Sequence, residues 1–206
     1  MTNTEAFDAP LTIDPDAVLV VIDVQKGFED HAFWGPRDNP EAEQRIGELI
    51  DTWQDTGRPV VVVQHASQAG PLVPGTAGYE LKDVVAQVRA DLHITKPVNS
   101  AFYGTPDLHA WLRERGARQV VIVGIMTNVC NETTARMAGN LGYDAIFPTD
   151  AMHTFDMVGP DGVTVPAAEL ARATATVLHA MRFAKVVTTA AVLTAATADR
   201  SAAAVG

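Results

Sequence analysis

Residues 119–147, QVVIVGIMTNVCNETTARMAGNLGYDAIF, contain two apolar runs with a helical pattern between them. The runs Gln119–Val123 and Asp144–Phe147 show no polar alternation, which is typical of strands buried on both faces. The residues that share one helical face between them, before Gly142, are Thr134, Met137, Ala138 and Leu141. Two buried strands joined by a helix predict a parallel sheet with a right-handed crossover.

The same alternation of strands and helices extends outward along the chain. Further β-branched runs occur at Ala17–Ile22, Pro59–Gln64 and Lys185–Thr188. Helices are predicted over Glu41–Thr56 and about Ala167–Phe183. The apolar stripe of the first of these is Ile46, Leu49, Ile50 and Trp53. The predicted fold class is therefore α/β.

One more helix is expected after Thr105-Pro106, which resembles an N-cap followed by proline at the first helical position. Its buried stripe is predicted to contain Leu108, Trp111 and Leu112, before Gly116. Three long loops rich in Gly, Pro or aromatic residues, a kind that is often functional, are Lys26–Pro40, Ala66–Gly78 and Thr149–Pro166.

Composition restricts the classes of protein to which the chain can belong. Its 206 residues, 47% hydrophobic and 19% charged, predict a single domain over 1–206, with an Ala-rich tail after Val192. The formal charge of −10 disfavours nucleic acid and anionic membranes as partners. The N-terminal stretch lacks the pattern of a secretory signal and no apolar run reaches the length of a membrane span, so we expect a cytoplasmic protein.

Three residues with side chains that can take part in catalysis follow apolar stretches of the chain. Asp23 ends the first strand, Lys96 follows a short apolar stretch, and Cys130 lies beyond the turn that follows the strand at 119–123. Each alone has an ordinary structural interpretation: a turn, a solvated lysine, a buried thiol. Together they form a nucleophile with its activators, because ligands of open α/β sheets bind at the carboxyl ends of the strands. A helix N-terminus at Cys130 is expected to favour thiolate.

At these residues the sequence resembles the isochorismatase-like hydrolase family. The segments VVIDVQKGF, ITKPVNSAFYGT and VIVGIMTNVCNETTARMAGNLGYDAIFPTDA are similar to the three signature regions of that family, in the same order. The resemblance covers about residues 15–193, the expected core, and implies a Rossmann-like three-layer α/β/α fold with a six-stranded, mostly parallel sheet. It implies an Asp23–Lys96–Cys130 triad and a cis peptide at Ile125-Met126. The backbone N–H groups of Met126 and Cys130 would then form an oxyanion hole.

The implied activity is hydrolysis of a C–N bond in a small amide, ureide or lactam through a thioester, without a cofactor. Two alternatives stay open. One is an isochorismatase-type vinyl-ether hydrolase in which Asp23 is the general acid and Cys130 is a bystander. The other is a non-catalytic scaffold that binds a small molecule. Family members commonly associate, so a homo-oligomer, either dimer or tetramer, is also expected.

Two further expectations concern metals and the substrate pocket. Members resembling nicotinamidases carry an Asp-x-His pair where this chain has Gln64-His65, so no metal is predicted. Aromatic residues in the loops near the strand ends are candidates for the pocket wall, with core or subunit contacts as the alternative. They are Phe28, Trp34, Phe102, Tyr103 and Phe155.

Overall fold

The computed structural model describes residues 10–203, and side chains to residue 198. The start of the N-terminal stretch and the last residues of the Ala-rich tail lie outside the described residues. One sheet has the strand order β3-β2-β1-β4-β5-β9, with every neighbouring pair parallel. Its strands are β1 (Val18–Ile22), β2 (Val60–His65), β3 (Leu92–Lys96), β4 (Gln119–Ile125), β5 (Asp144–Pro148) and β9 (Lys185–Val187).

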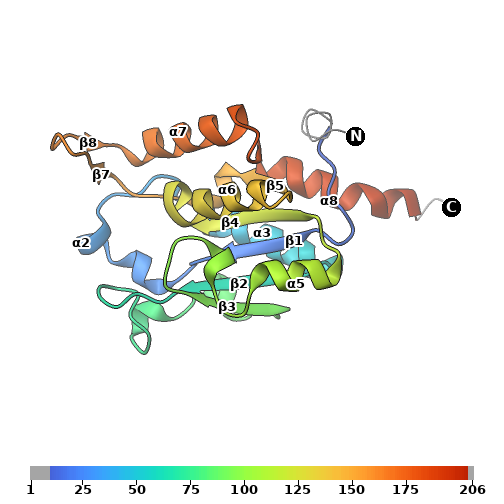
Figure 1. Ribbon diagram of the computed structural model, residues 1–206, viewed down its shortest axis with the longest axis horizontal. Helices are drawn as coiled ribbons and strands as arrows, with labels where there is room; N and C mark the ends of the chain where they lie inside the picture. Colours follow the sequence, from blue (N-terminus) through green and yellow to red (C-terminus); the bar gives the residue numbers. More distant parts are fainter. Residues whose placement is uncertain (1–9, 204–206) are drawn as a thin grey trace.

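The sheet gains one strand that the sequence did not predict. Within the described residues it has seven strands rather than six, because β6 (Met152–His153) pairs in parallel with Gly124 and Ile125 at the end of β4. Two residues are too few to show a strand pattern. A separate antiparallel hairpin, β7 (Met157–Val158) with β8 (Thr164–Val165), extends from the body of the molecule (Figure 1).

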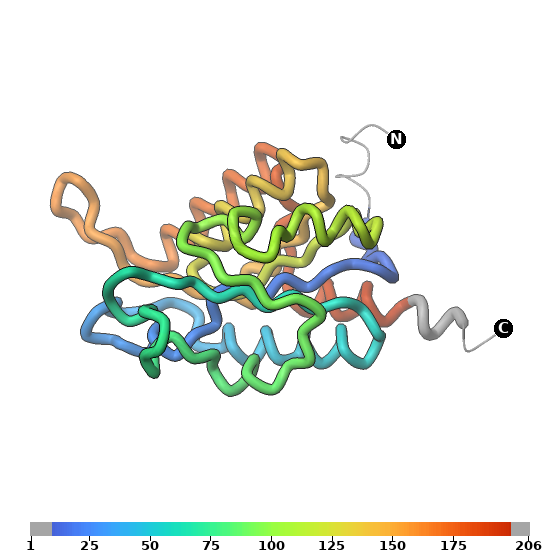
Figure 2. The backbone as a smooth tube through the Cα atoms, turned by 60° about the horizontal axis from the view of Figure 1, so that its bottom comes forward, coloured from blue at the N-terminus to red at the C-terminus, as the bar shows by residue number. Residues whose placement is uncertain are grey.

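Helices cover both faces of the sheet, which confirms the predicted three-layer α/β/α architecture (Figures 1 and 2). One layer contains α5 (Leu108–Arg115), α6 (Glu132–Asn140) and α7 (Ala167–Ala180). The other contains α3 (Ala42–Asp55), α4 (Asp83–Ala86) and α8 (Thr189–Ala203). The short α2 (His31–Trp34) lies within the first long loop.

Alternate residues of β1 show how the two cores form. Val18 and Val20 pack toward the α5, α6 and α7 layer, whereas Leu19 and Val21 pack toward α3 and α8. Successive side chains of a strand point to opposite faces, so a strand that is apolar throughout supplies both cores at once. On the α3 side, Trp53 is fully buried and its indole N–H donates to the Ala17 carbonyl at 2.8 Å.

The expected cap at Thr105-Pro106 is wrong. The α5 helix starts at Leu108, and the side chain of Asp107 caps it by accepting from the Ala110 N–H at 3.1 Å. Thr105 instead exchanges two backbone hydrogen bonds of 2.9 Å with Thr95 of β3, which hold it extended. The Thr105-Pro106 peptide bond is cis.

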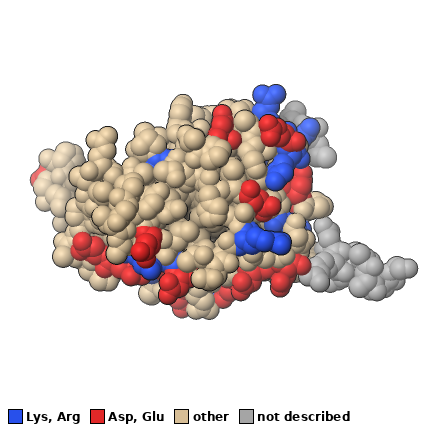
Figure 3. Space-filling model, turned by 90° about the horizontal axis from the view of Figure 1, so that it is seen from below, with Lys and Arg blue, Asp and Glu red and all other residues tan. Residues whose placement is uncertain are grey.

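The Ala-rich tail after Val192 continues helix α8 to Ala203, and Val192 and Ala196 are buried against the α3 layer. Within the described residues no helix is long and apolar enough to cross a membrane. The face seen from below carries a row of Asp and Glu side chains along its lower edge, in keeping with the net negative charge (Figure 3).

Candidate active site

The carboxyl ends of four parallel strands deliver the candidate site residues to one edge of the sheet. Asp23 directly follows β1, His65 ends β2 and Lys96 ends β3. Cys130 lies in a single π-helical turn, Thr127–Asn131, that joins the end of β4 to α6. The register pairs His65 with Lys96 as cross-strand neighbours. Parallel pairing thus gathers residues that are far apart in the chain.

Local backbone geometry sets the directions of these side chains. Asp23 has a φ of 54°, in the left-handed region that few residues other than glycine adopt, and its N–H donates to the Val63 carbonyl at 2.8 Å. Gly124, with a φ of 130°, lies so close to the Ile22 carbonyl that any side chain there would collide with it. Both features occur where the strands end and the site begins, which is where backbone strain tends to concentrate.

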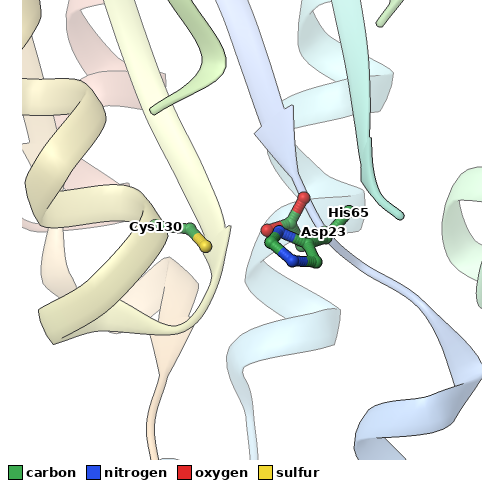
Figure 4. Close-up of side chains that lie close together, drawn as sticks. All are labelled: Asp23, His65 and Cys130. Atoms are coloured by element: carbon green, nitrogen blue, oxygen red, sulfur yellow. The ribbon is translucent and has the colours of Figure 1, made fainter. Parts of the chain in front are cut away.

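The structure brings the three sequence-predicted residues into direct contact. The Lys96 ammonium Nζ lies 2.7 Å from Asp23 Oδ2 and 3.3 Å from Cys130 Sγ. Asp23 and Lys96 are fully buried and the Cys130 residue is 6% exposed. The Asp23 carboxylate and the His65 imidazole lie side by side and face the Cys130 thiol across the strand ends (Figure 4). A carboxylate, a cation and a thiol therefore share one small, nearly dry volume.

Burial dominates the proton affinities of the site. It raises the pKa of Asp23 above its ordinary value, against the attraction of the Lys96 cation. Burial and the Asp23 carboxylate raise the pKa of the Cys130 thiol, again against Lys96. Burial and Asp23 therefore oppose the preference for thiolate that was expected from the helix N-terminus, and they favour the protonated thiol.

The turn before Cys130 has an unusual backbone. The Ile125-Met126 peptide bond is cis, and the Met126 carbonyl accepts from the N–H groups of Val129 and Asn131, both at 3.2 Å. The cis bond changes the direction of the backbone between β4 and the turn that carries Cys130.

The five candidate pocket aromatics lie in different surroundings. Phe28, Trp34 and Phe155 stack on one another, with ring centroids 4.9 to 6.1 Å apart, and pack with Ile125 and Met126. Phe102 is buried in the core on the α5, α6 and α7 side of the sheet and stacks on Tyr143. Tyr103 is 65% exposed. Only the first three therefore form one aromatic cluster at the turn before Cys130.

A cavity of about 380 Å³ opens near the aromatic cluster. It borders Phe28 but none of the three triad candidates, and most of its other lining residues are charged. These include Lys26, Glu29, Arg37, Glu43 and Lys82. The cavity is thus beside the catalytic edge rather than at the thiol.

Asp23, His65 and Cys130 offer donor atoms within 4.8 Å of one another, a spacing that also suits a metal ion. The Lys96 ammonium, however, contacts all three of these side chains. A metal ion bound there would meet a positive charge at contact distance in a buried site, which is strongly unfavourable. The donor set therefore fits the ammonium better than a metal.

The sequence predicted no metal-binding role for His65 and did not single out Gln25. His65 Nδ1 lies 3.2 Å from Lys96 Nζ. The buried Gln25 side chain accepts from the His65 N–H at 2.8 Å and donates to the His65 carbonyl at 3.2 Å. A register for the second and third strands, had it been available, would have placed His65 beside Lys96.

An open parallel α/β sheet with a carboxylate, an ammonium and a thiol at its strand ends defines a Rossmann-like fold with a candidate site where such sheets bind their ligands. The Isochorismatase domain model matches residues 17–191, and the chain belongs to the isochorismatase family of hydrolases. This confirms the family resemblance drawn from the three segments.

Individual relatives agree with this assignment. The uncharacterized isochorismatase family protein YrdC of Bacillus subtilis is 36% identical over 173 residues, covering 83% of this chain and 91% of YrdC. The ureidoacrylate amidohydrolase RutB of Methylorubrum extorquens is 30% identical over 181 residues, covering 70% and 73%. A crystal structure of a hydrolase of the isochorismatase family from Chromobacterium violaceum superposes with a TM-score of 0.85 at 34% identity, covering 91% and 97%.

Proposed function

We propose that this protein is a cysteine hydrolase that cleaves the C–N bond of a small amide, ureide or lactam. Asp23, Lys96 and Cys130 would act as a catalytic triad. The observation that carries the proposal is that one buried ammonium, that of Lys96, contacts both the Asp23 carboxylate and the Cys130 sulfur. The similarity to RutB, a ureidoacrylate amidohydrolase, supports C–N hydrolysis as the reaction class.

In the first half-reaction Asp23 accepts the Cys130 thiol proton as the sulfur attacks the substrate carbonyl carbon. The Lys96 cation offsets the repulsion between the carboxylate and the developing thiolate. The N–H groups of Met126 and Cys130 hold the tetrahedral oxyanion, each worth about 3 kcal/mol. Asp23 then gives its proton to the leaving nitrogen, the C–N bond breaks, and ammonia or an amine leaves a thioester on Cys130.

In the second half-reaction the Asp23 carboxylate takes a proton from water, and the resulting hydroxide attacks the thioester carbon. The same two N–H groups hold the new oxyanion. The C–S bond breaks, and the sulfur recovers the proton from Asp23. The product is a carboxylic acid, or a carbamic acid when the substrate is a ureide. A base with a raised pKa suits both steps, because it accepts and returns the same proton.

Vinyl-ether hydrolysis is the second candidate, and the raised pKa of Asp23 favours it, because a carboxyl that holds its proton can serve as a general acid. In that mechanism the thiol has no covalent role, so a Cys130→Ala variant keeps its activity. A non-catalytic scaffold, the third interpretation, shows no turnover in any variant.

The test is a screen of primary amides, ureides and lactams for released ammonia or amine, with Cys130→Ala as the matched control. Acid quench of an active reaction followed by mass spectrometry should show the acyl group on the peptide that contains Cys130. Turnover by wild type with no Cys130 adduct and with an active Cys130→Ala variant would overturn the covalent mechanism.

The proposal also covers the assembly and location of the protein. A homo-oligomer, dimer or tetramer, is supported by exposed apolar side chains near the catalytic edge and on the β7–β8 hairpin: Phe33, Tyr103, Val158 and Val163. Sedimentation equilibrium at micromolar concentration tests this, and a mass near 21.9 kDa would refute it. We propose no cofactor, and the cytoplasm as the compartment.

A further inference from the structure

His65 completes the set of hydrogen-bond acceptors around the Lys96 ammonium. An ammonium group has three N–H donors and no acceptor. The three acceptors around Lys96 Nζ are Asp23 Oδ2 at 2.7 Å, His65 Nδ1 at 3.2 Å and Cys130 Sγ at 3.3 Å. Because the ammonium is fully buried, an unpaired N–H there would carry a large desolvation cost. The third donor therefore makes His65 part of the arrangement rather than a bystander.

The contact fixes the protonation state and the tautomer of His65. Only a neutral imidazole with its proton on Nε2 offers Nδ1 as an acceptor. Two charged groups face the ring, Lys96 from β3 and Asp23 from the end of β1, and the Cys130 thiol lies opposite. Burial and Lys96 lower the pKa of His65, and Asp23 opposes them only in part. The ring is thus neutral at neutral pH.

His65 is held rigidly enough to orient a neighbour. Gln25, itself fully buried, forms hydrogen bonds with both the N–H and the carbonyl of His65. The Gln25 amide also donates to the Tyr79 carbonyl at 3.0 Å, which anchors it to the loop before α4. The backbone of His65 is therefore fixed from the β1 side as well as by its pairing with Lys96 in β3.

We propose that His65 is a positioning residue of the active site, which accepts the third N–H of Lys96 and so aims the other two at Asp23 and Cys130. The inference rests on the proposed function for its catalytic meaning, but its geometry is independent of any substrate. Without the His65 acceptor, Lys96 has freedom to turn away from the sulfur, and the thiolate loses part of its electrostatic stabilisation.

The experiment measures the pH dependence of Cys130 alkylation by iodoacetamide in wild type and in two His65 variants. His65→Leu removes the acceptor, whereas His65→Asn keeps one, because the Asn Oδ1 occupies about the place of Nδ1. We expect His65→Leu to slow alkylation at neutral pH by about tenfold and to raise its midpoint pH. His65→Asn should stay within about threefold of wild type. His93→Asn, on the exposed face of β3, is the matched control and should change nothing.

A double-mutant cycle separates positioning from a general structural role. If His65 acts through Lys96, His65→Leu has no further effect on alkylation in a Lys96→Met background. An equal effect in both backgrounds, or a His65→Asn variant that behaves like His65→Leu, would overturn the proposal. So would a His65→Leu profile that is identical to wild type.

A measurement on the unmutated protein keeps the proposal testable if His65→Leu fails to fold. Nitrogen-15 NMR of histidine-labelled wild type should show His65 neutral, with its proton on Nε2, at pH 7. A proton on Nδ1 would overturn the proposal, because Nδ1 would then have no lone pair for Lys96. A negative amide screen combined with the expected alkylation cycle would reject the proposed function and leave the role of His65 intact.

Discussion

Two clusters of charged side chains in this molecule have opposite arrangements of donors and acceptors. In the Lys96 cluster, one cation faces three acceptors, those of Asp23, His65 and Cys130. In the Glu43 cluster, one carboxylate faces three groups that can donate. Arg37 donates to both oxygens of the Glu43 carboxylate, at 2.7 and 2.8 Å. Lys82 Nζ lies 2.6 Å and His153 Nε2 3.4 Å from Glu43 Oε1.

The pKa values of the two carboxylates shift in opposite directions, although burial acts to raise both. For Asp23, burial outweighs a single cation and its pKa rises. For Glu43, burial also acts to raise the pKa, but hydrogen bonds from His153, Arg37 and Lys82 outweigh it and the pKa falls well below its ordinary range. The number of donors thus decides whether a carboxylate can take up a proton at working pH. The raised pKa of Asp23 suits the proton transfer proposed for it, whereas the lowered pKa of Glu43 favours a carboxylate that stays ionised.

The position of the Glu43 cluster indicates a structural role for its ionised carboxylate. Glu43 lies in the first turn of α3, and His153 belongs to β6, whose backbone pairs with Ile125 next to the cis peptide. Arg37 and Lys82 come from two separate loops. The cluster therefore ties the loops behind the catalytic turn to α3, and its loss should cost stability more than chemistry.

The largest effect should come from removing the nucleophile. Cys130→Ala and Cys130→Ser should lower kcat by about three orders of magnitude or more, because a triad without its nucleophile retains only binding and the oxyanion donors. Thermal unfolding should change little, since only a small side chain in a turn is altered. Wild-type-like turnover in either variant would show that Cys130 is a bystander. The Lys96 cluster would then not be the site of covalent catalysis.

Removing the cation should have the next largest effect. Lys96→Ala should raise the pH at which Cys130 is alkylated, because a charge that favours thiolate is lost. It should also destabilise the fold by about 3 kcal/mol, since Asp23 is left as a buried carboxylate without its partner. Lys96→Met, which conserves the side-chain volume, separates the charge from the packing. An unchanged alkylation profile in both variants would remove Lys96 from the site.

The pH dependence of kcat/KM should report the raised pKa of Asp23. Asp23 must be ionised to accept the thiol proton, so activity is present above its folded-state pKa and is lost as pH falls through it. Because that pKa is raised, the acid limb should lie above the ordinary aspartate value of about 3.9. Lys96→Met should move the limb to still higher pH. A limb at or below the ordinary value would contradict the assignment of Asp23 as the base.

Glu43→Gln tests the second cluster, and its effect should be on stability. We expect a loss of about 2 kcal/mol near neutral pH, less than for a fully buried pair because about a fifth of the Glu43 side chain is exposed. A depressed pKa contributes stability above the unfolded value, and that contribution is lost as pH falls toward the folded one. The difference between the variant and wild type in urea unfolding should therefore be largest at pH 7 and smaller at pH 3, where unfolded Glu43 is protonated but folded Glu43 is still ionised.

Glu48→Gln is the control for Glu43, because its ion pair with Arg45 lies on the surface of the same helix. No measurable change in unfolding is expected there. If Glu43→Gln and Glu48→Gln were equally neutral, the Glu43 cluster would not be the anchor described above.

The comparison also shows what the sequence can and cannot predict. The α/β fold was predictable because β1, β2, β4 and β5 are long apolar runs, and Asp23 and Cys130 follow two of them. The position of His65 beside Lys96 could not be predicted, because it depends on the register between β2 and β3, which no local pattern encodes. The Glu43 cluster had no signal, since Arg37, Lys82 and His153 lie in separate segments and meet only in three dimensions.

The smallest effect should come from metal removal, where we expect none. Dialysis against a strong chelator should leave the alkylation rate of Cys130, and any amide turnover found in the screen, unchanged. The reason is that Asp23, His65 and Cys130, the donor set that most resembles a metal site, already surrounds the Lys96 ammonium. A divalent ion would have to displace that cation or lie against it, and in a buried site their repulsion is barely screened. Loss of activity on dialysis, with recovery on adding zinc, iron or manganese, would show that a metal replaces the ammonium. The Lys96 ammonium would then not be the cation that Asp23, His65 and Cys130 surround.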